Sequence, residues 1–372
     1  MPAVPPADRS RISVLGIPNE RFYASERSGQ LGLEQEFIAA MGRYVAARGL
    51  PATAPLPELD LLAISGGGDD GAFGAGVLSG WSELGTRPSF FLVTGVSTGA
   101  LTAPFAFLGS AWDAALRAVY TEVTVADILE HRYYTAAIFD DAMADNRPLY
   151  RTISRHMDER MLAEIARAYD GGRLLLIATT NLDAERPVIW NIGAIAKSGH
   201  PNALETVRRI MLASAAIPGA FAPVLFDVTL DGRPHQELHV DGGVFAQAFL
   251  YPASVGDLRR QRAARRIPTA PARAWVIRNA RPQSTGSEVN RRTLGIVGRS
   301  ITSMISASGY NDIVRIYFAA QRDQVEYNLA YIGSDFTLPY NTPFDPAYMR
   351  PLYEYGRQRM LRGDVWAKSP PG

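Results

Sequence analysis

The stretch that decides the fold is Phe90-Phe-Leu-Val-Thr-Gly-Val-Ser97-Thr-Gly-Ala-Leu-Thr-Ala-Pro-Phe-Ala-Phe-Leu108. Its first part is a short run of apolar and β-branched residues, which predicts a buried strand, and its second part is long enough for a buried helix. Gly95 and Gly99 flank Ser97 at the junction, so the chain can turn sharply enough to expose the serine hydroxyl. The N-terminal end of the helix offers its positive dipole to negative charge that develops nearby. This Gly-x-Ser-x-Gly pattern therefore predicts a nucleophile elbow.

The residues just before this stretch repeat the same alternation of strand and helix. The mostly apolar run Leu59 to Ile64 predicts a buried strand, and Gly71 to Leu84 predicts a helix. With the strand at Ser89 to Thr94 and the helix at Thr98 to Leu108, the order is strand, helix, strand, helix with short connections. This order is typical of an α/β protein whose parallel sheet is covered by helices on both faces.

The remaining elements are weaker signals of the same class. Asp231-Gly232 predicts a tight hairpin turn between two strands. Strands are predicted at 173–179, 224–230, 235–240 and 274–278, and helices at 33–48 and 202–217. The strand at 274–278 is the last with clear sheet character, and residues 290–372 are expected to form helices and loops.

Composition excludes several classes of protein. The chain has 372 residues, 47% of them hydrophobic, and 38 basic against 37 acidic residues, so neither a disordered chain nor a strongly basic nucleic-acid binder is indicated. It has no cysteine, which excludes a disulfide scaffold, a thiolate metal site and a cysteine nucleophile. No signal peptide is visible at the N-terminus, so a cytoplasmic protein and an exported one remain open alternatives. The uncharged stretch from Pro88 to Trp112 contains helix breakers and is expected to be buried rather than membrane-spanning.

A glycine-rich loop follows the first strand. In Gly66-Gly-Gly-Asp-Asp-Gly71 the backbone amides can converge on an anion at the start of a helix. The loop also fits the Gly-x-Gly-x-x-Gly pattern of dinucleotide-binding proteins, which would make this a nucleotide-binding α/β protein. That interpretation requires an acidic residue about 20 positions later to hold the ribose, and position 91 is Phe91. A nucleotide is therefore the less favoured ligand.

A serine nucleophile needs a base, and the residues leave two kinds open. His235 and His239 lie on a predicted strand, and either could complete the histidine triad of an α/β-hydrolase carboxylesterase. However, no histidine follows His239, whereas that fold places its histidine late in the chain. Asp241, at the end of the same strand and before Gly242-Gly243, offers a carboxylate instead, on a backbone that can approach a neighbouring loop closely.

Taken together, these three motifs resemble those of the patatin-like phospholipases. The resemblance covers about residues 58–280 and includes Ala213-Ser-Ala-Ala-Ile-Pro-Gly-Ala-Phe-Ala-Pro223, which is similar to the family's segment before its Asp loop. It implies a three-layer α/β/α fold with a mostly parallel sheet, and a lipid acyl hydrolase that needs no metal or organic cofactor. It also implies roles for ten residues: Ser97 as nucleophile, Asp241 as proton acceptor, Gly66, Gly67 and Gly68 as the oxyanion hole, and Gly71, Gly95, Gly99, Gly242 and Gly243 as motif support.

The resemblance also suggests how the chain is divided. We expect an N-terminal leader and helix over 1–57, a patatin-like catalytic domain over 58–285, and a C-terminal helical extension over 286–372 packed on the same unit. The family's glycine loop usually has a basic residue just before its last glycine, where this chain has Asp70. An acid there weakens attraction to a phosphate headgroup, so the preference between phospholipids and neutral esters stays open, as do acyl-chain length and oligomeric state.

One region has unbalanced charge. The stretch from Arg259 to Arg299 is rich in arginine, and Glu288 is its only acidic residue. Such a stretch can face an anionic membrane surface, or it can be a solvated loop and helix face whose neutralising acids come from elsewhere in the fold. The second interpretation is the simpler one.

Overall fold

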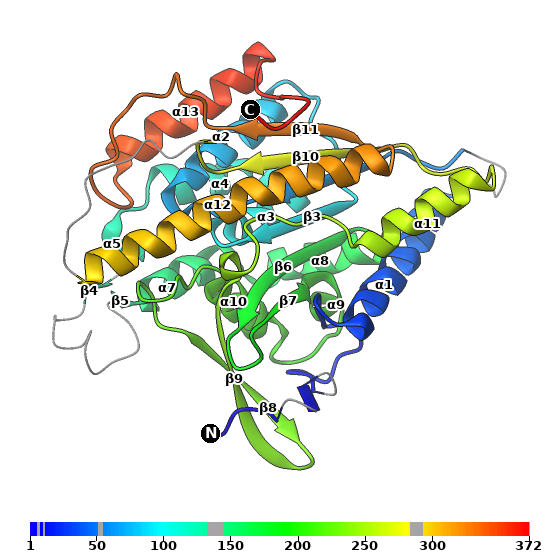
Figure 1. Ribbon diagram of the computed structural model, residues 1–372, viewed down its shortest axis with the longest axis horizontal. Helices are drawn as coiled ribbons and strands as arrows, with labels where there is room; N and C mark the ends of the chain where they lie inside the picture. Colours follow the sequence, from blue (N-terminus) through cyan, green and yellow to red (C-terminus); the bar gives the residue numbers. More distant parts are fainter. Residues whose placement is uncertain are drawn as a thin grey trace.

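The computed structural model describes residues 1–5, 8–9, 12–50, 55–128, 130–131, 144–282 and 293–371. Within these residues a nine-stranded sheet forms the centre, with strands in the order β1-β7-β6-β3-β2-β10-β11 and β9 and β8 branching from β6 (Figure 1). The parallel strands are β2 (Leu59–Ile64), β3 (Leu92–Val96), β6 (Leu174–Asn181), β10 (Ala272–Arg278) and β11 (Glu326–Tyr331). The antiparallel pairings join β7 (Arg186–Asn191) to β6 and to β1 (Arg21–Tyr23), and β9 (Arg233–Asp241) to β6 and to β8 (Val224–Leu230).

Helices cover both faces of this sheet and bury two separate cores. One core contains side chains of α1 (Arg27–Ala46) and α12 (Thr293–Arg322), with α11 (Ala253–Ala264) beside them; Figure 1 looks onto this face. The other core lies under α2 (Gly71–Glu83), α3 (Thr98–Leu108), α4 (Asp113–Thr121), α5 (Val125–Ile128), α7 (Arg147–His156), α8 (Glu159–Asp170), α9 (Ile192–Lys197), α10 (Ala203–Ser214) and α13 (Pro346–Arg362). The predicted three-layer α/β/α architecture is therefore confirmed. A short pair, β4 (Glu130–His131) and β5 (Ala144–Asp145), lies apart from the main sheet.

The first predicted elements agree closely with the structure. The strand at Leu59–Ile64 and the helix at Thr98–Leu108 have the predicted bounds. All six residues of β2 are buried, as expected for a strand covered on both faces. The second strand was predicted too early: β3 is Leu92–Val96, because these are the residues that pair with β2 and β6.

The hairpin prediction is also confirmed. Asp231 and Gly232 both have positive φ angles, 47° and 78°, in the turn between β8 and β9. This geometry matches the right-handed twist of the two strands it connects.

The expectation that residues 290–372 form only helices and loops was wrong. β11 lies in this segment and pairs in parallel with β10 along its whole length. Its apolar pattern is interrupted by Asn328, which is buried. The side-chain Nδ2 of Asn328 donates a hydrogen bond to the carbonyl of Ala274 in β10. A buried polar residue is stable here because it has a hydrogen-bond partner in a distant strand. The local sequence shows only a polar residue within an apolar run, so it does not predict a buried strand.

Helix α13 packs against α2 at close range. A Cβ atom on Gly76 would lie 1.9 Å from the carbonyl oxygen of Tyr353, and one on Gly80 would lie 2.7 Å from that of Arg357. Two glycines on α2 therefore allow its backbone to touch that of α13. This contact brings the C-terminal region beside the glycine-rich loop from which α2 begins.

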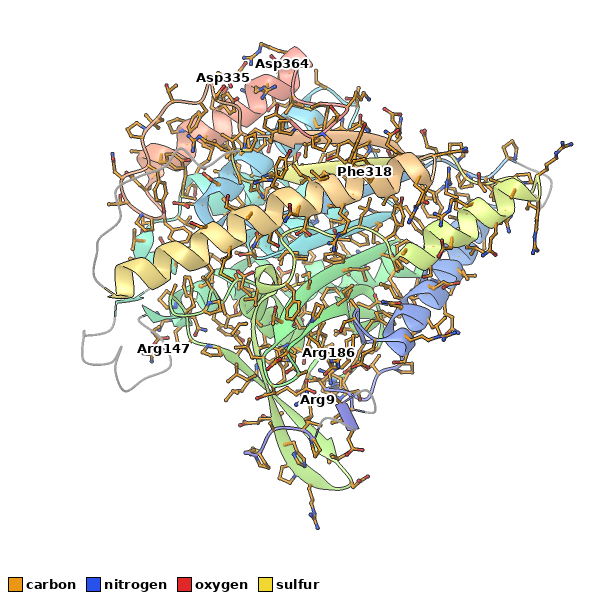
Figure 2. The ribbon with its side chains drawn as sticks, in the orientation of Figure 1. Arg9, Arg147, Arg186, Phe318, Asp335 and Asp364 are labelled. Carbon is orange, nitrogen blue, oxygen red and sulfur yellow. The ribbon has the colours of Figure 1, made fainter. Side chains whose placement is uncertain are left out.

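Several arginines of the region 259–299 have partners inside the fold. Arg260 pairs with the buried Asp323, Arg259 donates to the carbonyl oxygen of that residue, and Arg273 pairs with Asp60. Residues 283–292 of this region lie outside the described residues. On the outer side of α12, Phe318 is 64% exposed (Figure 2). Among the described residues, none of the helices has an apolar stretch long enough to span a membrane.

Candidate active site

Ser97 sits at a strained turn between β3 and α3. Its φ and ψ angles are 55° and −127°, a conformation that residues other than glycine rarely adopt. The flanking glycines permit the turn, since a Cβ atom on Gly95 would lie 2.5 Å from the carbonyl oxygen of Gly99, and one on Gly99 would lie 2.2 Å from that of Ile64. The serine is therefore held where β2 and β3 end, at the N-terminus of α3.

Asp241 lies beside Ser97, although the two residues are far apart in sequence. It ends β9, which pairs with β6 at Thr179, and β6 is the neighbour of β3. The Ser97 hydroxyl lies close enough to the Asp241 carboxylate to lower its pKa, and both residues are almost inaccessible to solvent. Burial raises the pKa of Asp241 to about 7, partly offset by the hydrogen bonds from Ser97 and the Gly243 amide. A carboxylate with this pKa can accept a proton near neutral pH.

The loop after Asp241 is fastened to its surroundings by backbone contacts. The Gly243 amide donates a 2.7 Å hydrogen bond to the Asp241 carboxylate, and the Asp241 amide donates to the carbonyl of Ala216 at 2.9 Å. A Cβ atom on Gly242 would lie 2.5 Å from the carbonyl oxygen of Ala178 in β6. The carboxylate is therefore held in one orientation.

The glycine-rich loop lies against the serine from the β2 side. A Cβ atom on Gly66 would lie 3.1 Å from the Cβ atom of Ser97. The amide of Gly66 is already engaged, because it donates to the carbonyl of Gln247 at 3.2 Å. Among the described residues, the amides of Gly67 and Gly68 have no intramolecular acceptor, and both residues have positive φ angles, 155° and 58°. These two amides can therefore accept an anion.

Asn279 holds the glycine-rich loop in place. Its amide and its side-chain Nδ2 donate to Ser65 Oγ and to the Ser65 carbonyl at 2.9 and 3.0 Å, and its Oδ1 accepts from the Gly74 amide at 3.1 Å. Sequence reasoning missed this residue. The available signal was its position directly after the predicted strand at 274–278.

Ser214 supports the elbow itself. Its Oγ accepts a 3.0 Å hydrogen bond from the Ser97 amide and donates one of 2.7 Å to the carbonyl of Ala178. It was also missed, although it belongs to the segment 213–223 that carries part of the family resemblance. It links the elbow to β6, the strand beside which Asp241 lies.

Gln247 joins the glycine-rich loop to the Asp loop. Its carbonyl accepts from Gly66, its Nε2 donates to the Gly243 carbonyl at 3.3 Å, and its side chain is almost fully buried. Its own amide donates to Asp312 on α12 at 2.6 Å. Nothing in the local sequence distinguishes this residue, because its importance comes entirely from contacts with distant segments.

The acidic pair of the loop faces the C-terminal region. Asp69 accepts a 2.9 Å hydrogen bond from the Phe344 amide, and Asp70 accepts one of 2.7 Å from the Tyr348 hydroxyl. Burial raises the pKa of Asp70 to about 6, although the bond from Tyr348 opposes the rise. The acid that replaces the family's usual basic residue is thus bound to α13.

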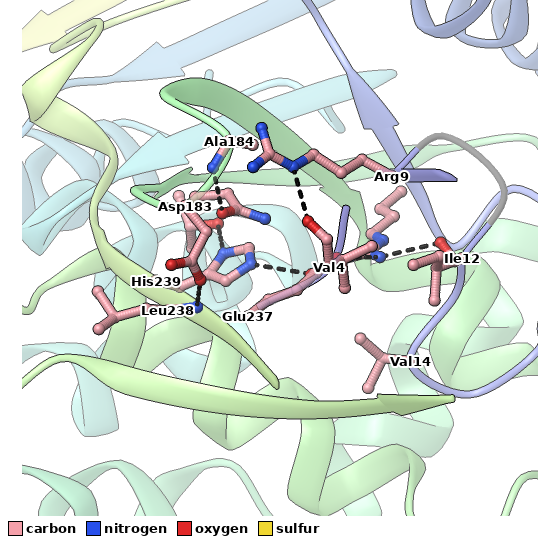
Figure 3. A network of polar contacts seen from close by, with 12 residues as sticks. Val4, Arg9, Ile12, Val14, Asp183, Ala184, Glu237, Leu238 and His239 are labelled. Atoms are coloured by element: carbon pink, nitrogen blue, oxygen red, sulfur yellow. Dashed lines mark hydrogen bonds and ion pairs between the residues drawn. The ribbon is translucent and has the colours of Figure 1, made fainter. Parts of the chain in front are cut away.

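The two histidines considered as bases are engaged elsewhere. His239 is fully buried, with Nδ1 2.9 Å from Thr179 Oγ1 and Nε2 3.3 Å from a Glu237 oxygen (Figure 3). Glu237 also pairs with Arg21 of β1, so this network fastens the N-terminal strand to β9. His235 lies within 3.2 Å of the Ala3 carbonyl. A triad through Ser97 is therefore not assembled in this structure.

The segment that contains the site is similar to a known protein family. A family model described as patatin-like phospholipase matches residues 62–254, which contain the glycine-rich loop, the elbow and the Asp loop. The crystal structure of VipD from Legionella pneumophila is similar over 83% of this chain and 67% of that chain, with a TM-score of 0.40 and 12% sequence identity. The search of curated proteins found no match. Among the described residues, no group of three acidic or histidine side chains is arranged to hold a metal ion.

Proposed function

Since this chain belongs to the patatin-like phospholipase family, and is thereby a lipid acyl hydrolase, we propose that it cleaves carboxylic esters through an acyl-enzyme on Ser97. Asp241 is the base in this proposal, and the loop Gly66 to Gly68 stabilises the oxyanion, mainly through the free amides of Gly67 and Gly68. The observation that carries the proposal is that the Ser97 hydroxyl lies beside the buried Asp241 carboxylate, at the turn where Ser97 has a strained backbone conformation.

The reaction has two steps. Ser97 Oγ attacks the ester carbonyl carbon while its proton passes to Asp241, and the two loop amides stabilise the negative charge on the carbonyl oxygen. The intermediate collapses as the C–O bond to the alcohol breaks, and the alcohol leaves with the proton that Asp241 returns. Water then attacks the acyl-enzyme, again giving a proton to Asp241, and the fatty acid is released as Ser97 is restored.

Two substitutions test this proposal. Ser97→Ala and Asp241→Asn should each lower kcat for p-nitrophenyl butyrate by about 1,000-fold or more. Ser198→Ala is the matched control, because Ser198 is exposed at the end of α9 and its Oγ bonds only nearby backbone, donating to the Ile195 carbonyl and accepting from the His200 amide. A fluorophosphonate probe should label Ser97 in the wild type, with the labelled peptide identified by mass spectrometry. Labelling of another serine, or substantial turnover in either variant, contradicts the dyad.

A further inference from the structure

An apolar cavity lies between α1 and α11, two helices that pack side by side on one face of the sheet (Figure 1). Its volume is about 270 Å³. Phe37, Ile38 and Met41 of α1 form one wall, and Val255 and Leu258 of α11 form another. The space is therefore lined by side chains from two elements that are far apart in the sequence.

The cavity leaves apolar side chains exposed that a helix interface would ordinarily bury. In α11, which the structure describes completely, only Gly256 is buried. Val255 and Leu258 line the cavity but stay partly exposed, and Ile38 on α1 is 51% exposed. A ligand that covered these side chains would remove apolar surface from water, which is favourable.

Polar contacts hold α11 in place beside the cavity. A Cβ atom on Gly256 would lie 2.2 Å from Asp323 Oδ2, so the helix backbone lies directly against that carboxylate. Arg259 donates hydrogen bonds to the backbone carbonyls of Asp323, Ala270 and Gln324. These contacts fix the position of α11 without requiring its apolar side chains to fill the space beneath it. The cavity is thus part of the folded structure and is already open.

One end of the cavity carries a positive charge. Arg262 lies one turn beyond Leu258 on the same face of α11, and it lines the cavity. Among the described residues, its exposed guanidinium has one hydrogen-bond partner, the Pro268 carbonyl at 3.1 Å, and no carboxylate. Thr269, next to that carbonyl, also lines the cavity, and none of the lining residues is acidic. An anion at this end would therefore meet a cation that no acid of the lining neutralises.

The cavity lies at the opposite edge of the sheet from the candidate active site. Leu59 and Ala272, the first residues of β2 and β10, line it. The glycine-rich loop and Ser97 instead follow the last residues of β2 and β3. At about 3.3 Å per residue, the length of β2 separates the two edges by about 16 Å. A ligand in the cavity is therefore distinct from an acyl chain bound at Ser97.

We propose that this cavity binds the anion of a single-chain fatty acid, with the chain between α1 and α11 and the carboxylate at Arg262. A guanidinium can bind a carboxylate through two parallel hydrogen bonds. The volume is close to the lower end of the range for small-molecule sites, about 300 Å³, which suits one acyl chain better than a two-chain lipid. A lipid acyl hydrolase releases this class of molecule, so the site can hold a product away from the dyad. The inference goes beyond the proposed function, because the site uses neither Ser97 nor Asp241.

Titration calorimetry with decanoate, below the concentration at which it forms micelles, tests the assignment. Arg262→Met should raise Kd by about 5- to 20-fold, because the carboxylate loses its charged partner. Arg265→Met is the matched control and should leave Kd unchanged, since Arg265 is exposed at the end of α11 and does not line the cavity. From hexanoate to decanoate, Kd of the wild type should fall about 2- to 4-fold for each added methylene. 1-Decanol, which has the same chain without the charge, should bind equally to wild type and Arg262→Met.

A second variant tests the position of the chain. Leu258→Trp fills the cavity and should abolish decanoate binding while p-nitrophenyl butyrate turnover stays within twofold, with circular dichroism to check folding. The exposed Arg262 gives an independent test should this variant fail to fold. Decanoate binding that is unchanged in Arg262→Met, or that is lost only when a fluorophosphonate occupies Ser97, overturns the proposal.

Two further outcomes separate the alternatives. If decanoate does not bind, but Arg262→Met and Arg265→Met equally weaken binding to phosphatidylglycerol vesicles, α11 faces an anionic membrane and the proposal is overturned. Ser97→Ala should bind decanoate as the wild type does. If no ester is hydrolysed while Arg262-dependent binding of decanoate persists, the proposed function fails and the fatty-acid site stands.

Discussion

The hydroxyl of Tyr348 donates a 2.7 Å hydrogen bond to the carboxylate of Asp70, 278 residues earlier in the chain. This contact joins α13 to the loop whose amides face the candidate nucleophile. Together with the bond from the Phe344 amide to Asp69, it gives the glycine-rich loop two anchors in the C-terminal region. The C-terminal region is therefore expected to affect catalysis through its contacts with this loop.

Removing the Tyr348 hydroxyl should weaken both folding and catalysis. In Tyr348→Phe the buried Asp70 carboxylate loses its hydrogen bond, so we expect the free energy of unfolding to fall by about 1–3 kcal/mol. We also expect kcat for p-nitrophenyl butyrate to fall several-fold, because the loop amides are less well held. Urea denaturation and steady-state kinetics measure the two effects. Tyr355→Phe on the same helix is the control, since its hydroxyl bonds Asp335 and not the loop; an equal loss of kcat there would refute a specific role for Tyr348.

The pH dependence of activity should follow the pKa of Asp241. Because the carboxylate must be ionised to accept the Ser97 proton and burial raises its pKa to about 7, kcat/KM should rise about tenfold per pH unit below that value and level off above it. A pH profile with p-nitrophenyl butyrate measures this. A profile that is already flat between pH 5 and pH 8 would show that Asp241 does not titrate as the base.

The same pKa predicts a pH-dependent difference in stability. Folding raises the pKa of Asp241 from 3.8 to about 7, so its protonated form contributes stability that is fully present below about pH 4 and lost as the pH rises through 7. Asp241→Asn cannot titrate, so its stability relative to wild type should increase between pH 4 and pH 8, by up to about 4 kcal/mol. Urea denaturation at several pH values checks this. A constant difference across that range would contradict the raised pKa.

Two neighbouring glycines should respond very differently to alanine. A Cβ atom on Gly67 would lie 2.1 Å from the Asn279 carbonyl oxygen, whereas one on Gly68 has no atom within 4 Å. Gly67→Ala must displace the loop, so we expect a loss of about 100- to 1,000-fold in kcat. Gly68→Ala adds only the strain of its positive φ angle, about 1–2 kcal/mol of stability, and should keep most of the activity. Similar kcat values for the two variants would argue against a role for the loop amides.

The local parts of the site could be predicted from the sequence for a physical reason. The turn at Ser97 requires glycine at positions 95 and 99, where a side chain would collide with the backbone. These positions are close together in the sequence, so the requirement is visible as a short Gly-x-Ser-x-Gly motif. The hairpin at Asp231-Gly232 is of the same kind. The family resemblance was confirmed because three such patterns occur in the expected order.

The missed residues depend on contacts between distant segments. Ser214, Gln247 and Asn279 act through hydrogen bonds to other strands and loops. Their residue types are common on protein surfaces, so the local sequence does not mark them as part of a site. The strand β11 was missed for a related reason, because its buried Asn328 finds its hydrogen-bond partners in distant residues, Ala274 of β10 and Lys368. Patterns within a short window contain no information about such partners.

The anchoring of the glycine-rich loop by Tyr348 also has a consequence for biosynthesis. During translation, Asp70 leaves the ribosome 278 residues before its partner. At about 5–20 residues per second this interval lasts roughly 15 to 55 s. Ser97 and Asp241 are both synthesised within it, so the nascent chain contains its proposed nucleophile and base before the loop is anchored. The order of synthesis thereby delays completion of the proposed active site until α13 has been made.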